Sequence, residues 1–134
     1  MNKRLLIVED HADFRKIVKA YLESQKLNLE IRDVESAEEA IEEAGRFKPD
    51  IILMDIRLPN MNGIEAATEI KKALPNCEII VLTVFETAGF RAIFKSKDIA
   101  AYIGKSELYE KLVPRLKIII KNGNPNGSKS EVAP

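Results

Sequence analysis

Polar residues that could bind a metal ion or phosphate close four short apolar runs of this chain. They are Glu9, Asp10, Asp55, Thr83 and Lys105. If the runs form parallel strands, these residues share the edge at which such sheets bind their ligands. Three carboxylates at one edge repel one another unless a cation lies among them. Hard oxygen ligands with room for water and phosphate suit Mg²⁺. The pattern therefore favours a magnesium site at this edge.

Each of these residues also has a purely structural interpretation. Asp10 could cap the first helix, and Asp55 could belong to a turn before Pro59. Thr83 could simply end a strand, and Lys105 could be a solvated turn residue. It is much harder to explain by chance that all four of these residues stand at the ends of different strands. We therefore favour the functional interpretation of the whole set.

The elements that must position this set alternate regularly between strand and helix patterns. Apolar runs predict buried strands at 5–8, 51–54 and 79–82, and weaker patterns predict an edge strand at 29–34 and a brief strand at 100–103. Helical spacing of apolar residues predicts helices over 14–22, 36–47, 64–74, 90–94 and 106–120. We expect Ser36 and Ser106 to cap two helices and Pro114 to kink or locally unwind the last one. Strict alternation implies a doubly wound parallel α/β sheet with helices on both faces.

Length and composition limit the classes of protein to which the chain can belong. It has 134 residues, 21 basic and 21 acidic side chains and a formal net charge of zero. These values indicate one globular domain without the attraction of a basic protein to nucleic acid or acidic lipid. The single cysteine, Cys77, excludes an internal disulfide and a cysteine-based zinc site. No apolar run has the length of a membrane span or a signal peptide, so we expect a cytoplasmic protein.

Five segments carry an ordered series of motifs. They are Val8-Glu9-Asp10, Met54-Asp55-Ile56-Arg57-Leu58-Pro59, Met61-Asn62-Gly63-Ile64-Glu65-Ala66, Leu82-Thr83 and Ala101-Tyr102-Ile103-Gly104-Lys105. In order and spacing, over about residues 3–121, they resemble the receiver domain of bacterial two-component response regulators. The resemblance implies a flavodoxin-like (βα)5 fold with strand order 2-1-3-4-5. It also implies a receiver domain over residues 1–121, and the shift to Asn, Gly, Pro and Ser after Lys121 predicts a flexible tail over residues 122–134.

The resemblance implies a role for each residue of the set. Asp55 would accept a phosphoryl group from the phosphohistidine of a sensor kinase or phosphotransfer protein and become an acyl phosphate. Mg²⁺, or Mn²⁺ in its place, would be bound by Glu9, Asp10, Asp55 and the backbone carbonyl of Arg57. Thr83 and Lys105 would contact the phosphoryl oxygens. Thr83 and Tyr102 would change conformation together as the switch.

These roles imply a signalling protein that catalyses its own phosphotransfer and autodephosphorylation, rather than a metabolic enzyme. Its partners would be a sensor histidine kinase or phosphotransfer protein, and a downstream protein or an effector domain outside this chain. We expect the chain itself to bind neither nucleic acid nor membranes. Phosphorylation could drive dimerisation.

Some positions depart from the family pattern. Val84 follows the threonine where a small residue is usual, which would narrow access to the phosphoryl site or slow hydrolysis. Ser106 replaces a proline that is common after the lysine, so a cis peptide bond there would be costly. Asp98 and Ala101 replace glycines that often flank the fifth strand. None of these positions belongs to the set above.

Three other functions are compatible with parts of the pattern. A phosphatase of the haloacid dehalogenase type needs a second acid two residues after its nucleophile, where this chain has Arg57. A flavodoxin-like flavin carrier needs hydroxyls and glycines around residues 9–14, where acidic side chains would repel the flavin phosphate. A constitutive protein-binding module of receiver type would keep the fold without phosphorylation.

We interpret His11, the only histidine, as a solvated residue near the start of the first helix.

Overall fold

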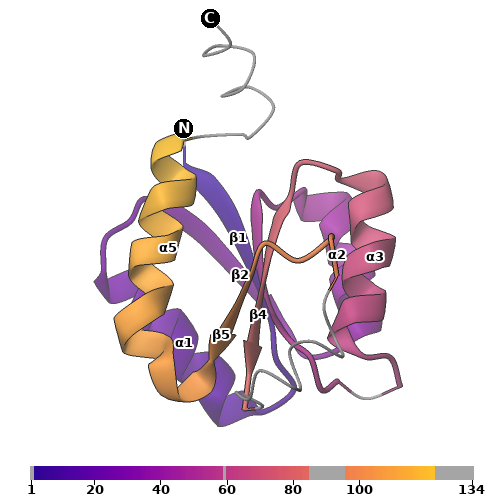
Figure 1. Ribbon diagram of the computed structural model, residues 1–134, viewed down its shortest axis with the longest axis horizontal. Helices are drawn as coiled ribbons and strands as arrows, with labels where there is room; N and C mark the ends of the chain where they lie inside the picture. Colours follow the sequence, from indigo (N-terminus) through magenta and orange to yellow (C-terminus); the bar gives the residue numbers. More distant parts are fainter. Residues whose placement is uncertain (1, 59, 85–95, 123–134) are drawn as a thin grey trace, which may run out of the picture.

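The computed structural model describes residues 2–58, 60–84 and 96–122, which form a sheet between two layers of helices (Figure 1). The strands are β1 (Lys3–Val8), β2 (Leu29–Val34), β3 (Ile51–Asp55), β4 (Glu78–Thr83) and β5 (Ala101–Gly104). The helices are α1 (Ala12–Ser24), α2 (Ala37–Phe47), α3 (Gly63–Ala73), α5 (Leu108–Asn122) and the short 3-10 helix η1 (Lys105–Glu107). The predicted helix over 90–94 and most of the predicted tail lie outside the described residues.

The sheet has five strands in the order β2-β1-β3-β4-β5, and every neighbouring pair is parallel. The predicted doubly wound α/β fold with strand order 2-1-3-4-5 is therefore confirmed. The mixed pattern at 29–34 is explained by the position of β2 at an edge, where several of its residues stay half-buried. The fully buried β3 lies at the centre, between β1 and β4.

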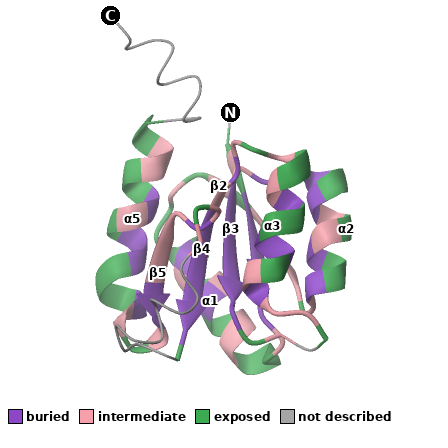
Figure 2. Ribbon diagram, turned by 45° about the vertical axis from the view of Figure 1, so that its right-hand side comes forward, coloured by how far each residue is buried: buried purple, intermediate pink, exposed green. Residues whose placement is uncertain are grey.

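Side chains of the strands alternate between two apolar cores on opposite faces of the sheet. Leu5 and Ile7 of β1 pack in the core formed with α1 and α5. Leu6 and Val8 pack in the other core, formed with α2 and α3. Figure 2 shows the resulting burial, with buried central strands and helices exposed on their outer faces. Burying one such side chain contributes roughly 1.5–3 kcal/mol, so strands covered on both faces are continuous apolar runs.

The last helix differs from the sequence prediction in its continuity and in its start. α5 continues through Pro114 without local unwinding, because Leu112, Val113 and Leu116 around it are buried against the sheet. Their burial offsets the roughly 3 kcal/mol that a proline costs inside a helix. Ser106 lies within η1 instead of at the start of the long helix. No described peptide bond is cis, including the one that precedes Ser106. None of the described helices is both long and apolar enough to cross a membrane.

The start of α3 is held against the end of β3. Asn62 is the N-cap residue: its Oδ1 accepts from the Glu65 amide (2.9 Å), and Glu65 Oε1 accepts from the Asn62 amide (3.1 Å). Gly63, the first residue of the helix, donates its amide hydrogen to the carbonyl of Ile56 at 2.9 Å. A Cβ atom at Gly63 would overlap the carbonyl oxygen of Asp55 and lie 3.0 Å from Ile56 Cα. Only glycine permits this close approach of the helix to the strand.

We expect Gly63→Ala to lower the free energy of unfolding by about 1–3 kcal/mol, because backbone must move to admit the methyl group. Gly45→Ala is the matched control, since a methyl group at this position of α2 would point into open space, with no neighbouring element within 4 Å. It should raise that free energy by about 0.5–1 kcal/mol through helix propensity. Urea denaturation of both variants measures the difference. Stabilisation by both substitutions would contradict the close approach at Gly63.

Candidate functional site

The carboxyl ends of four strands meet at one edge of the sheet and bring most of the predicted residues together. Glu9 follows β1, Asp55 ends β3, Thr83 ends β4 and Lys105 follows β5. The buried polar and charged side chains of the described residues are three of these, with exposed fractions of 3% for Glu9, 5% for Asp55 and 1% for Thr83. Buried polar groups are costly, so their concentration at this edge marks it as the candidate site.

Lys105 connects the two buried acids. Its Nζ lies 2.8 Å from Glu9 Oε1 and 3.2 Å from Asp55 Oδ2. The other oxygen of Asp55, Oδ1, accepts a hydrogen bond from the Arg57 amide at 3.0 Å. The ring of Phe14 lies beneath the ammonium group, with its centroid 4.4 Å from Nζ. Both oxygens of Asp55 are thus held in place, and the lysine is held by two charges and an aromatic face.

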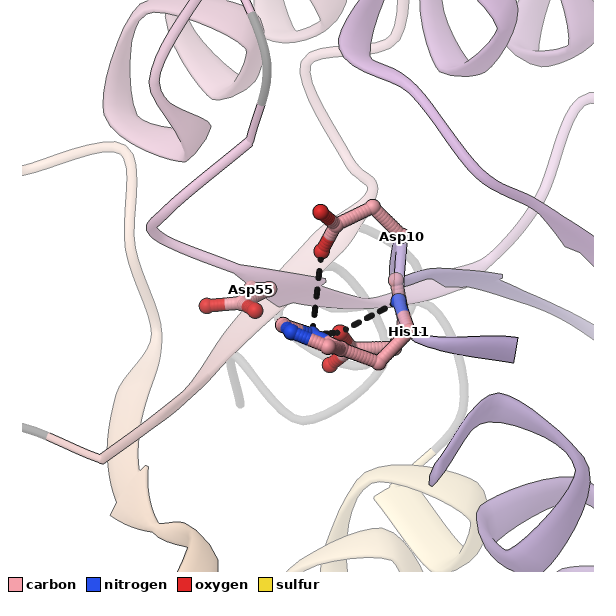
Figure 3. A group of neighbouring side chains, drawn as sticks. Asp10, His11 and Asp55 are labelled. Atoms are coloured by element: carbon pink, nitrogen blue, oxygen red, sulfur yellow. Dashed lines mark hydrogen bonds and ion pairs between the residues drawn. The ribbon is translucent and has the colours of Figure 1, made fainter. Parts of the chain in front are cut away.

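Asp10 and His11, in the loop after β1, lie near Asp55 (Figure 3) and are more exposed than that residue. His11 Nδ1 lies 2.9 Å from Glu9 Oε2 and 3.2 Å from Asp10 Oδ1, and the His11 amide donates to Glu9 Oε2 at 3.1 Å. One ligand atom from each of Glu9, Asp10, His11 and Asp55 lies within 4.8 Å of the others. His11 is exposed, as the sequence predicts, but its ring belongs to this group instead of being solvated alone.

The geometry of Asp10 fits a cation site better than a helix cap. The N-cap residue of α1 is His11, and no side chain caps that helix. Asp10 Oδ1 is buried and accepts no hydrogen bond from any described residue. This oxygen pairs with His11 Nδ1 at 3.2 Å without a hydrogen bond, and a buried carboxylate oxygen that lacks a hydrogen-bond donor is further stabilised when a metal cation approaches it. Together with the neighbouring carboxylates, it offers the hard oxygen ligands that Mg²⁺ prefers.

The two buried acids have opposite pKa shifts. Burial acts to raise the pKa of Glu9, but hydrogen bonds from Lys105 and His11 outweigh it and leave this pKa below its usual value. Burial raises the pKa of Asp55, and the charge of Glu9 adds to this effect, whereas the Arg57 amide and Lys105 offset only part of it. Asp55 is therefore the acid whose charge is poorly compensated, which is typical of groups in functional sites.

The two basic side chains of the site hold their protons more tightly than usual. Burial acts to lower the pKa of Lys105, but the hydrogen bond to Glu9 and the charge of Asp55 raise it overall. The hydrogen bond with Glu9 and the negative charge of Asp10 raise the pKa of His11. Lys105 therefore remains a cation at neutral pH, next to a carboxylate with unbalanced charge.

An open depression of about 510 Å³ gives access to the site from solvent. It is lined by Asp10, His11, Asp55, Arg57, Leu58, Val84 and Lys105. The exposed Val84 belongs to its wall, at the position from which the sequence predicts an effect on access. A small anionic group can therefore approach Asp55 without displacing the core.

Thr83 and Tyr102, the two residues of the predicted switch, lie on the neighbouring strands β4 and β5. Thr83 pairs with Gly104 in the register of β4 and β5, immediately before Lys105. Tyr102 packs partly buried against the core on the side of α2 and α3. Its hydroxyl oxygen accepts a hydrogen bond from the Ser96 amide at 3.0 Å. The tyrosine is thus tied to the segment that precedes β5.

Comparison with known proteins agrees with this geometry. Residues 5–117 match the family model of the response regulator receiver domain. Response regulator protein VraR of Staphylococcus epidermidis is 40% identical over 105 residues, which cover 77% of this chain and 49% of that protein. Transcriptional regulatory protein DegU of Brevibacillus brevis is 28% identical over 120 residues, which cover 90% of this chain and 51% of that protein. The chain spans about half the length of these curated relatives.

Solved structures show the same fold. Response regulator TrrA of Thermotoga maritima, determined in complex with Mg(2+)-BeF, has a TM-score of 0.77 and 30% identity, with 87% of this chain and 97% of that chain covered. A LuxR-family regulator from Aurantimonas has a TM-score of 0.81 at 24% identity, covering 99% of this chain and 96% of that chain, and supports the fold alone. The family match spans most of the chain and includes the whole acidic edge, so this chain belongs to the response regulator receiver domains of two-component systems.

Proposed function

We propose that this domain accepts a phosphoryl group on Asp55, from a sensor histidine kinase or a phosphotransfer protein, and changes conformation in response. The observation that carries the proposal is the contact of Lys105 with Asp55 and Glu9, at 3.2 and 2.8 Å, beside the open depression. A buried carboxylate reachable from solvent and adjacent to a fixed ammonium group is suited to phosphoryl transfer, which depends on positioning and charge neutralisation.

The proposed metal ligands are Glu9, Asp10, Asp55 and the backbone carbonyl of Arg57, with Mg²⁺ or Mn²⁺ as the ion. The buried Asp10 Oδ1 that accepts no hydrogen bond from the described residues supports this assignment. The TrrA structure, whose complex contains Mg(2+)-BeF, also supports it. When bound, the ion would neutralise negative charge on the transferring group and on the three carboxylates.

In the proposed reaction an Asp55 oxygen forms a bond to phosphorus while the bond from phosphorus to the histidine nitrogen of the donor breaks. The electron pair of that bond leaves with the imidazole. Asp55 enters the reaction ionised, since its carboxylate lies beside Lys105 and the Arg57 amide. Lys105, which keeps its proton, then offsets charge on the phosphoryl oxygens. In autodephosphorylation a water oxygen bonds to phosphorus, the bond from phosphorus to the Asp55 oxygen breaks, and inorganic phosphate leaves the free carboxylate behind.

The proposed switch consists of Thr83 and Tyr102. The added phosphoryl group carries nearly two negative charges, and the Thr83 hydroxyl and Lys105 are the proposed groups that turn to it. Tyr102 is then expected to change rotamer and leave its contact with the Ser96 amide. The readout would pass to a downstream protein or to an effector domain, in some cases through a dimer. The match to the relative named as a transcriptional regulatory protein covers only about half of that protein, which supports an effector domain.

Asp55→Asn should abolish phosphorylation, because an amide is a poor nucleophile toward phosphorus. Incubation with acetyl phosphate and Mg²⁺, followed by intact-protein mass spectrometry, measures the added phosphoryl group. Asp13→Asn is the matched control, since Asp13 is an exposed acid in the first turn of α1 and should leave phosphorylation unchanged. A phosphoryl adduct retained in Asp55→Asn would assign the reaction to another residue.

Neutralising the two buried acids should change stability in opposite directions in the metal-free protein. The pKa of Asp55 is raised on folding, so its charge destabilises the fold above that pKa, and Asp55→Asn should stabilise by about 1 kcal/mol at neutral pH. The pKa of Glu9 is lowered, so Glu9→Gln should destabilise by about 1–3 kcal/mol. Both differences should shrink as pH falls below the ordinary carboxyl pKa. Urea denaturation with EDTA at several pH values tests the signs, and equal signs would contradict the assigned environments.

Mg²⁺ should raise the melting temperature of the wild-type protein, because an ion that binds only the folded state stabilises it. At a concentration 100 times the dissociation constant the gain is about 2.7 kcal/mol. Asp10→Asn should lose most of this shift, whereas Asp13→Asn should keep it. Calorimetric melting with Mg²⁺ or EDTA measures the effect. An equal shift in the Asp10 variant would remove this residue from the ligand set.

A further inference from the structure

We propose that Arg15 and Asp33 are positioning residues for the metal site, because together they hold the peptide unit that joins Glu9 to Asp10. The inference rests on the proposed function, in which these two acids bind Mg²⁺. Within the described residues, the hydrogen bonds and ion pairs of Arg15 and Asp33 do not involve the carboxylates of the site. Their effect would be transmitted through the backbone carbonyl of Glu9.

Arg15 reaches the Glu9 carbonyl from the first turns of α1. Its Nη1 donates to the carbonyl oxygen of Glu9 at 2.7 Å, and its Nε donates to Asp33 Oδ2 at 2.9 Å. The Arg15 side chain is only 14% exposed, so this pair is shielded from most of the solvent. A planar guanidinium can donate to two partners in fixed directions at once, which a flexible ammonium group does less well.

Asp33 anchors the arginine on the edge strand. It lies in β2 opposite Ile7 of β1, and it also accepts from Lys19 Nζ at 3.1 Å. The next residue of β2, Val34, accepts the Glu9 amide hydrogen at 3.1 Å. Glu9 is therefore attached to β2 through its own amide and, by way of Arg15 and Asp33, through its carbonyl.

This attachment fixes the direction in which the chain enters Asp10. The carbonyl of Glu9 and the amide of Asp10 share one planar peptide unit, so a bond to that carbonyl restrains the plane. Asp10 contributes the buried oxygen that accepts no hydrogen bond among the described residues, and its position depends on this plane. Groups that orient a ligand without touching the metal typically change its affinity by about 10- to 100-fold.

Lys19 provides a matched control on the same helix. It pairs with Asp33 at 3.1 Å, as Arg15 does at 2.9 Å, but none of its hydrogen bonds or ion pairs among the described residues reaches Glu9. Removing Lys19 thus perturbs the charge of Asp33 without releasing the carbonyl. A difference between the two variants isolates the contact with Glu9 from general electrostatics.

The test compares wild type, Arg15→Met, Arg15→Lys, Lys19→Met and Asp33→Asn, all well below their melting temperatures. Titration calorimetry with MgCl₂ should give a dissociation constant about 10- to 100-fold higher for Arg15→Met. Arg15→Lys and Asp33→Asn should show smaller increases in the same direction. Lys19→Met should stay within about twofold of wild type. The double variant Arg15→Met with Asp33→Asn should be no weaker than Arg15→Met, because both act through one carbonyl.

A second readout uses the metal-free protein. Arg15→Met should increase the hydrogen-exchange rate of the Glu9 amide about tenfold relative to the amide of Ile80 in β4, and Lys19→Met should not. A third readout is phosphorylation of Asp55 by acetyl phosphate, in which an Asp55 oxygen bonds to phosphorus and acetate departs with the electrons of the broken bond. Saturating Mg²⁺ should restore the rate in Arg15→Met, because the defect lies in metal affinity.

The outcomes separate this inference from the proposed function. Wild-type Mg²⁺ affinity in a folded Arg15→Met protein would overturn the inference, even if that variant melts at a lower temperature. A rate that saturating Mg²⁺ fails to restore would do the same. If the wild-type protein neither bound Mg²⁺ nor became phosphorylated, the proposed function would fail. The amide exchange of Glu9 would then still report whether Arg15 holds the carbonyl.

Discussion

The site depends on one ammonium group that lies between two almost fully buried carboxylates. Lys105 contacts Glu9 and Asp55 from the end of β5, the last strand of the sheet. Burying a charge without a partner costs several kcal/mol, so the lysine allows both acids to stay buried at this edge of the sheet. It does not balance them, because Asp10 adds a third carboxylate to the group. The folded domain therefore carries a local excess of negative charge that a bound cation would relieve.

The rest of the fold supplies the position of that lysine. β5 is an edge strand of four residues, and only the parallel pairing of β4 with β5 brings its end beside β3 and β1. Leu108 and Leu112 of α5 are buried behind it, and Phe14 of α1 lies beneath the ammonium group. Local burial, pairing and the aromatic contact thus act together on a single side chain. A loss of packing in α5 would therefore displace Lys105 from the acids before it disturbed the central strands.

Much of this arrangement could be predicted from the sequence, and the limits have physical causes. The runs at 51–54 and 79–82 identify buried strands because both faces of the sheet are covered, and residues that end parallel strands must share an edge. The contacts of Arg15 depend on the rotation of α1 against β2, which a helical pattern does not define. The place of His11 in the acidic group depends on the same rotation. The local unwinding considered at Pro114 does not occur, because tertiary packing of α5 outweighs a local preference.

Asp55 is held so firmly that its own strand cannot move when the charge of the side chain changes. Oδ1 is held by the Arg57 amide, the carbonyl of the next residue accepts from Gly63, and the α3 backbone leaves no room for a methyl group beside it. β3 is also the central strand, with all five residues buried. Movement must therefore occur in the groups that face the carboxylate. Among the described residues these include Lys105, which directly follows the edge strand that carries Tyr102. The rigidity of β3 thus directs a change at Asp55 toward β5.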